Sequence, residues 1–224
     1  MLQDTLIIFD CDGVLVDSEQ ISAIACSEYL CRFGIELSPS ECIRKFRGKR
    51  FADLVFTLNS QYSDYIKEKE IHQLEAYIAA SLNEKLLPIP GVENVIEFLC
   101  KNNVPFCVAS SGSYKKTQGS LNRVGFLKFF SDRIYSSEGL KLGKPAPDIF
   151  LHAAKKMGIN CQHSVVIEDS YYGVLAAVRS GAQTINYVGD FPDIRISTID
   201  AEIYTADTMS DVLEYILNIN ELVM

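Results

Sequence analysis

Four short runs of mainly β-branched, aromatic or other apolar residues constrain the fold of this chain more than any other feature. The runs cover residues 5–9, 105–109, 164–167 and 183–188. A strand without polar alternation suits a parallel sheet that is covered by helices on both faces. Helical patterns bounded by proline, glycine or capping residues lie between the runs, at residues 91–102, 147–157 and 171–180. This alternation predicts an α/β fold built on a doubly wound, Rossmann-like parallel sheet.

One long interval interrupts the alternation. Residues 18–86 have a mainly helical pattern and are too many for a plain loop. Breaks at Gly34, Pro39, Gly48 and residues 60–64 divide the interval into several helices. We therefore expect an α/β core made of residues 1–17 and 87–224, and an inserted all-helical domain made of residues 18–86.

Charge and composition exclude several classes of partner. The chain has 224 residues and a formal net charge of −8, which disfavours nucleic acid because phosphate backbones are bound by basic surfaces. No uncharged apolar run approaches the length of a membrane span. The seven cysteines are odd in number and form no CxxC pair, which is typical of reduced cytosolic thiols. We expect a cytoplasmic monomer that binds neither nucleic acid nor membranes.

Acidic side chains follow two of the predicted strands. Asp10 and Asp12 come after the first run, and Glu168 and Asp169 come after the third. Ligands of open α/β sheets bind at the carboxyl ends of the strands, so these four carboxylates are expected in one crevice. At ~4 Å separation, like unit charges repel by roughly 1–4 kcal/mol. A hard divalent cation relieves that repulsion, and an all-oxygen ligand set suits Mg²⁺.

Groups that suit a phosphoryl ligand are expected at the same edge. Ser110 and Ser111 follow the second run and offer hydroxyl and amide donors ahead of a helix. Lys144 lies on a constrained turn between Gly143 and Pro145. A metal, a donor loop and a lysine are the parts that phosphoryl transfer needs, and a carboxylate beside the metal can act as the nucleophile.

Four short motifs, in order and at family spacing, resemble those of the haloacid dehalogenase superfamily. They are residues 9–19 with Asp10-Cys11-Asp12-Gly13, then Ser110, then Lys144 in Gly-Lys-Pro-Ala-Pro-Asp, and then Glu168-Asp169-Ser170. The helical insert is similar to the small C1 cap of that superfamily. The nearest branch contains β-phosphoglucomutase-like proteins and sugar-phosphate phosphatases.

The resemblance implies a Mg²⁺-dependent phosphatase that forms an aspartyl phosphate. It makes Asp10 the nucleophile and Asp12 the general acid and base. Mg²⁺ would be held by Asp10, the backbone carbonyl of Asp12 and Asp169, with Glu168 acting directly or through water. Ser110, the amide of Ser111 and Lys144 would hold the phosphoryl oxygens, and the cap would close over a small phosphorylated metabolite.

A basic stretch in the insert offers a place for a second anionic group. Five of the ten residues from 41 to 50 are basic. In the resembled family, the loop around the corresponding glycine faces the active site, which assigns substrate contacts to Arg47, Gly48, Lys49 and Arg50. Alternatively, these basic residues form a solvent-exposed helix face that has no role in substrate binding. The functional interpretation favours a sugar-acid phosphate as well as a plain sugar phosphate.

A hexose-phosphate mutase is the main alternative function. In the mutases, the cap carries a histidine shortly after the first motif and an arginine shortly after the cap glycine. This chain has Ser22 and Phe51 at the aligned positions, which favours hydrolysis, although Arg50 lies next to the second position. A dehalogenase does not need Asp12, a phosphonate hydrolase needs a cap lysine that we do not identify, and a non-enzymatic receiver domain lacks the helical insert.

Overall fold

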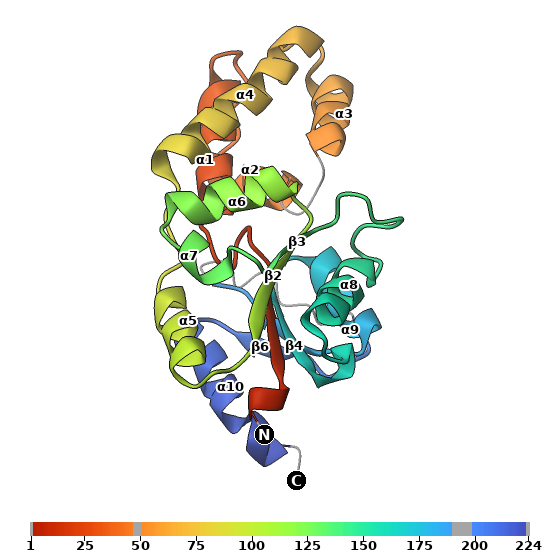
Figure 1. Ribbon diagram of the computed structural model, residues 1–224. Coiled ribbons are helices and arrows are strands. Elements are labelled where there is room, and N and C mark those ends of the chain that lie inside the picture. The colour runs from red at the N-terminus through yellow and green to blue at the C-terminus, as the bar shows by residue number, and fades with distance from the viewer. Residues whose placement is uncertain (1, 47–50, 190–198, 223–224) are drawn as a thin grey trace. The chain divides into compact units, whose positions relative to one another are not determined.

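The chain divides into two compact units. The computed structural model describes residues 2–46, 51–189 and 199–222. One unit comprises Met1–Val16 and Pro88–Met224, and the other comprises Asp17–Leu87. The first unit is α/β and the second is helical (Figure 1). That the helical unit acts as a cap stays a prediction.

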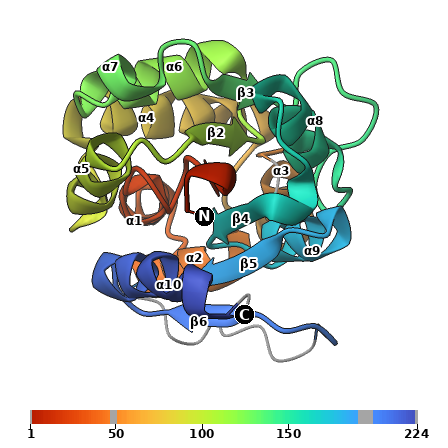
Figure 2. The same cartoon turned by 60° about the horizontal axis from the view of Figure 1, so that its bottom comes forward.

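A six-stranded parallel sheet forms the centre of the α/β unit. The strands are β1 (Leu6–Phe9), β2 (Phe106–Ser110), β3 (Ile134–Ser136), β4 (Ser164–Glu168), β5 (Gln183–Tyr187) and β6 (Tyr204–Ala206). Their order is β3-β2-β1-β4-β5-β6, and every neighbouring pair is parallel. The order reverses between β1 and β4, as in a doubly wound sheet, so the predicted fold class is confirmed (Figure 2).

Helices cover both faces of this sheet. They are α5 (Val92–Lys101), α6 (Tyr114–Arg123), α7 (Leu127–Phe130), α8 (Asp148–Met157), α9 (Tyr171–Ser180) and α10 (Met209–Leu222), with short 3₁₀ turns at Leu2–Asp4 and Cys161–His163. Helices α5 and α10 lie on one face, and α8 and α9 lie on the other (Figures 1 and 2). The three helices expected from the sequence are confirmed as α5, α8 and α9.

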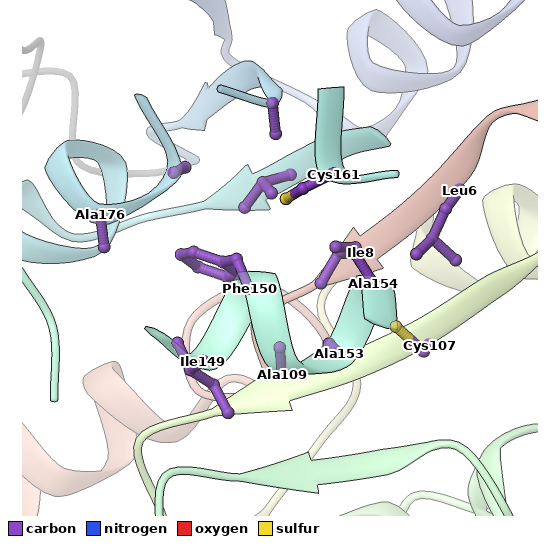
Figure 3. Packing of buried hydrophobic residues seen from close by; sticks show 13 residues of the cluster. Leu6, Ile8, Cys107, Ala109, Ile149, Phe150, Ala153, Ala154, Cys161 and Ala176 are labelled. Carbon is purple, nitrogen blue, oxygen red and sulfur yellow. The ribbon is translucent and has the colours of Figure 1, made fainter. Parts of the chain in front are cut away.

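Burial on both faces explains the continuous apolar runs. All four residues of β1 are fully buried. Leu6 and Ile8 join the cluster around α8 that Figure 3 shows. On the opposite face, the Phe9 ring meets Phe130 edge-on, with ring centroids 6.2 Å apart. Alternate residues of one strand thus enter two separate cores, because successive side chains point to opposite faces.

The helical unit contains four helices among its described residues. They are α1 (Ser18–Cys31), α2 (Pro39–Phe46), α3 (Phe51–Tyr62) and α4 (Glu68–Lys85). The predicted breaks at Gly34, at Pro39 and at residues 60–64 are confirmed, whereas Gly48 lies outside the described residues. At the start of α2, Glu41 and Ser38 exchange backbone and side-chain hydrogen bonds, which is the capping-box arrangement.

Two features of composition have a direct structural counterpart. All seven cysteines are free thiols, and five of them are buried. Within the described part of the chain, no helix combines the length and the apolar character that a bilayer crossing requires.

Candidate active site

The first strand delivers Asp10 into the interior of the α/β unit. Asp10 follows β1 directly, is buried, and its backbone N–H donates to the carbonyl of Ile167 in the neighbouring strand β4 (3.0 Å). The chain then turns back, because the N–H of Gly13 donates to the carbonyl of Val16 (2.8 Å). The backbone of Asp10 is therefore held by the sheet itself, independently of its side-chain contacts.

Lys144 joins the carboxylates of Asp10, which follows β1, and Glu168, the last residue of β4. We call this set the inner contact. Its ammonium donates to Oδ1 of Asp10 (2.6 Å) and to Oε1 of Glu168, and all three side chains are buried. Burial alone lowers the pKa of Lys144, but attraction to the two carboxylates outweighs it and raises that pKa. Lys144 is therefore a charged ammonium held between two acids.

Glu168 also organises the start of helix α9. Its Oε2 accepts the backbone N–H groups of Asp169 and Ser170, each at 2.9 Å, and the Ser170 hydroxyl at 3.0 Å. A Cβ at Gly173 would lie 1.9 Å from the Glu168 carboxyl carbon, so only glycine fits there. Glu168 is thus held on both oxygens, by Lys144 on one side and by the helix start on the other.

Asp169 lies beneath the turn that follows β1. Asp169 is buried, and a Cβ at Gly13 would lie 2.0 Å from its Oδ2. Gly13 has a φ of +78°, which glycine adopts without strain. The Asp-x-Asp-Gly sequence therefore needs glycine for two reasons, the backbone conformation and the space that the Asp169 carboxylate fills.

Asp12 pairs with a second lysine, and we call this pair the outer contact. The ammonium of Lys116, on the first turns of α6, lies 2.7 Å from Oδ2 of Asp12. Both side chains are partly exposed. Burial tends to lower the pKa of Lys116, but the Asp12 carboxylate reverses the sign and raises it. The role of this lysine could not be predicted, because nothing local in the sequence links residues 12 and 116.

The loop after β2 forms a tight turn ahead of α6. Ser110 is buried, and its hydroxyl oxygen accepts the backbone N–H of Gly112 (3.0 Å), which leaves its own O–H able to donate. Ser113 caps α6 by accepting the N–H of Lys116 (3.1 Å). Ser111 lies between these two serines and is exposed. The two predicted phosphate-binding serines thus lie at the carboxyl end of β2, beside β1 in the sheet.

The predicted convergence of acids is visible in the electrostatics of Asp10. Burial is the main cause that raises the pKa of Asp10 well above its usual range, and Lys144 opposes it. The negative charges of Glu168, Asp169 and Asp12 each raise it further. Four acids and two lysines therefore share one edge of the sheet.

These lysines change the argument for a cation. The acidic residues in the sequence predict a metal ion that relieves their repulsion, whereas Lys144 and Lys116 supply positive charge in the structure. Within the described residues, no three His, Cys, Asp or Glu side chains form a group ready to hold a metal. Asp10 and Asp169 still offer the carboxylate oxygens that Mg²⁺ prefers, while both Glu168 oxygens are engaged. The metal roles of Asp10, Asp12, Glu168 and Asp169 stay predictions.

The four residues assigned to substrate contacts in the helical unit are not placed. Arg47, Gly48, Lys49 and Arg50 lie outside the described residues. Their roles stay predictions as well.

Comparisons with known proteins point to one family. A family model described as haloacid dehalogenase-like hydrolase matches residues 7–187. The 6-phosphogluconate phosphatase of Escherichia coli (strain K12) is 29% identical over 82% of this chain and 82% of its own. A haloacid dehalogenase-like protein of unknown function from Agrobacterium tumefaciens has a TM-score of 0.85 at 32% identity, covering 96% of this chain and 98% of the other.

A second similar solved structure contains bound phosphate and sodium. It is a HAD family hydrolase from Deinococcus radiodurans. Its TM-score is 0.80 at 26% identity, covering 97% of this chain and 96% of that chain.

Proposed function

The chain belongs to the family of haloacid dehalogenase-like hydrolases, and from that premise we propose that it is a phosphatase of small phosphorylated metabolites. The proposed substrates are sugar or sugar-acid phosphates, hydrolysed with Mg²⁺ through an aspartyl phosphate on Asp10. The observation that carries the proposal is the inner contact, in which Lys144 binds the carboxylates of Asp10 and Glu168 together.

Asp10 is the proposed nucleophile. Its backbone is fixed by β4 and its Oδ1 by Lys144, so attack needs little reorganisation of the side chain. The ammonium of Lys144 favours the ionised, nucleophilic form of Asp10 and so opposes burial, which raises the pKa of that carboxyl group. The same ammonium would attract the phosphoryl oxygens as they approach Asp10.

Asp12 is the proposed general acid and base. It lies two residues beyond the nucleophile on a turn fixed by the Gly13 amide, and its side chain is partly exposed. It would protonate the leaving oxygen and then accept a proton from the attacking water. Catalysis of this kind is typically worth 10²–10⁴-fold.

The remaining predicted groups would bind the phosphoryl oxygens and a cation. Ser110 would donate its hydroxyl, and Ser111 its amide, from the loop after β2. Asp10, Asp169 and the carbonyl of Asp12 would hold Mg²⁺, with Glu168 acting through water because both its oxygens are engaged. When bound, the cation would neutralise charge on the phosphoryl group.

Hydrolysis is favoured over phosphoryl transfer to a second sugar. The relative from Escherichia coli is named a phosphatase and not a mutase. Ser22 and Phe51 stand at the aligned positions for the mutase histidine and arginine, and this departure also favours hydrolysis. A sugar-acid substrate also suits the basic residues Arg47, Lys49 and Arg50, and reversing the charge of Lys49 or Arg50 should then raise KM for anionic substrates.

The test is phosphate release from sugar, sugar-acid and nucleoside monophosphates, 6-phosphogluconate included. We expect release from at least one sugar or sugar-acid phosphate, loss of release with a chelator, and recovery with added Mg²⁺. Asp10→Asn should abolish turnover, whereas Asp132→Asn, which changes an exposed acid, should not. An Asp10→Asn variant that works at the wild-type rate contradicts the mechanism. Isomerisation of β-glucose 1-phosphate without phosphate release supports a mutase instead.

A further inference from the structure

The loop after β3 holds the loop after β2 through a run of hydrogen bonds. The backbone N–H of Ser137 donates to the carbonyl of Ser110 (3.1 Å). The Ser137 hydroxyl donates to the carbonyl of Ser111 (3.0 Å), and the Ser136 hydroxyl donates to the carbonyl of Gly112 (2.6 Å). Three consecutive carbonyls of the loop after β2 are therefore bound by two consecutive serines, which we name the serine clasp.

The clasp is itself held in place at both of its ends. Ser136 is the last residue of β3 and lies opposite Ser110 in the register of the sheet. The N–H of Glu138 donates to the Ser136 hydroxyl (3.1 Å), which orients that hydroxyl toward Gly112. The Glu138 carboxylate then accepts the N–H of Tyr114 at the start of α6 (2.9 Å). The loop after β2 is thus fixed along its whole length by residues 136–138.

Because the peptide bond is planar and trans, the bound carbonyls also determine the direction in which the amides of residues 111–113 point. The C=O of one residue and the N–H of the next lie in the same peptide plane and point in opposite directions within it. With the carbonyls of Ser110, Ser111 and Gly112 turned toward the clasp, the next three amides must face away from it. The amide of Gly112 meets the Ser110 hydroxyl, which leaves the amides of Ser111 and Ser113 directed away from β3.

We propose that Ser136 and Ser137 are positioning residues that direct the Ser113 amide and the Ser110 hydroxyl of the loop after β2 toward the phosphoryl group. This inference rests on the proposed function, because it assigns a phosphoryl ligand to that loop. Neither serine touches the ligand. Each hydroxyl acts through a carbonyl. Loss of the Ser136 hydroxyl frees the Gly112–Ser113 peptide, so that the Ser113 amide can turn away from the ligand. Loss of the Ser137 hydroxyl frees the Ser111–Gly112 peptide, so that the Gly112 amide no longer orients the Ser110 hydroxyl, which would donate to the ligand.

The test measures binding of inorganic phosphate in the presence of MgCl₂ by the whole protein. Each lost hydrogen bond should weaken phosphate binding roughly threefold to tenfold, and the Ser136→Ala/Ser137→Ala variant should combine both losses. Ser137→Thr keeps the hydroxyl and should recover most of the affinity. Ser131→Ala, an exposed serine at the end of α7, is the matched control.

Kinetics with p-nitrophenyl phosphate provide a second measurement. Ser137→Ala should raise KM more than it lowers kcat, because Asp10 and Asp12 keep their own contacts. If the double variant does not fold, this single variant decides the question.

The inference is overturned if the folded serine variants bind phosphate as tightly as Ser131→Ala. A different failure identifies the proposed function as wrong. If the wild-type protein neither binds phosphate nor releases it from any ester, both the function and the clasp inference fall together.

Discussion

The inner and outer contacts of the site differ most in their access to solvent. Lys144 exposes 7% of its side chain, and its partners Asp10 and Glu168 expose 9% and 1%. Lys116 and Asp12 expose 48% and 22%. An exposed ion pair contributes about 0–1 kcal/mol to stability, whereas a buried charge that loses its partner is strongly destabilising. The inner contact therefore maintains the fold as well as the site, and the outer contact leaves its acid within reach of water.

This difference matches the two roles that we propose for the acids. A nucleophile gains from a fixed position, because correct orientation removes much of the entropy cost of attack. A general acid and base must exchange its proton with the leaving group and with water. The buried Asp10 suits the first role, and the partly exposed Asp12 suits the second.

The largest effect on stability is expected at the inner contact. Lys144→Met leaves the carboxylates of Asp10 and Glu168 buried without their cation, so the free energy of unfolding should fall by about 3–5 kcal/mol at neutral pH. Activity should be lost as well. Urea unfolding measures the change, with Lys141→Met as the control because that lysine is exposed on the same loop. Equal stability of the two variants would mean that the inner contact is not structural.

An intermediate effect is expected from the space that Glu168 fills. Gly173→Ala places a methyl group 1.9 Å from the Glu168 carboxyl carbon, and that carboxylate cannot yield easily because both its oxygens are bound. Overpacking of this kind should cost about 1–3 kcal/mol of unfolding free energy.

Gly119 provides the matched control for this prediction. It is also a helical glycine, in α6, but a Cβ there would meet nothing within 4 Å. Gly119→Ala should therefore stabilise the protein by about 0.4–1 kcal/mol. A destabilisation shared by both alanine variants would point to the helices rather than to Glu168.

The smallest effect on stability is expected at the outer contact. Lys116→Met should change the free energy of unfolding by less than ~1 kcal/mol. Its kcat should nevertheless fall about tenfold, a barrier change of ~1.4 kcal/mol, because Asp12 loses the cation that orients it. Lys116→Arg should restore most of kcat. Lys115→Met, at the neighbouring residue, is the control. A similar loss of kcat in that variant would contradict a specific role of Lys116 in orienting Asp12.

Much of the inner contact could be predicted from the sequence. Asp10 and Glu168 lie at the ends of continuous apolar runs, and the rule that ligands bind at the carboxyl ends of parallel strands brings them together. What the sequence could not supply was the pairing itself. The sequence predicts that Lys144 binds a phosphoryl group, whereas the structure places its ammonium between two acids. That pairing depends on the burial of all three side chains.

The outer contact and the serine clasp were not predictable in the same way. Lys116 reaches Asp12 from the first turns of a helix, across 104 residues of sequence. The clasp begins at β3, a strand of three residues at the edge of the sheet, and so short a strand has no measurable periodicity. Strand β6 was missed for the same reason. The one available signal was Ser136 and Ser137 themselves, two hydroxyls in a row shortly before the motif of Lys144.

Trapping of the covalent intermediate on Asp10 tests the central claim most directly. The Asp12→Asn variant should still be phosphorylated by p-nitrophenyl phosphate, whose leaving group needs no acid, but should release the phosphoryl group slowly. Acid quenching followed by borohydride reduction would convert an aspartyl phosphate to homoserine, which peptide mass spectrometry can locate. The account predicts homoserine at position 10 and nowhere else. Phosphate release with an unmodified Asp10 throughout turnover would contradict it.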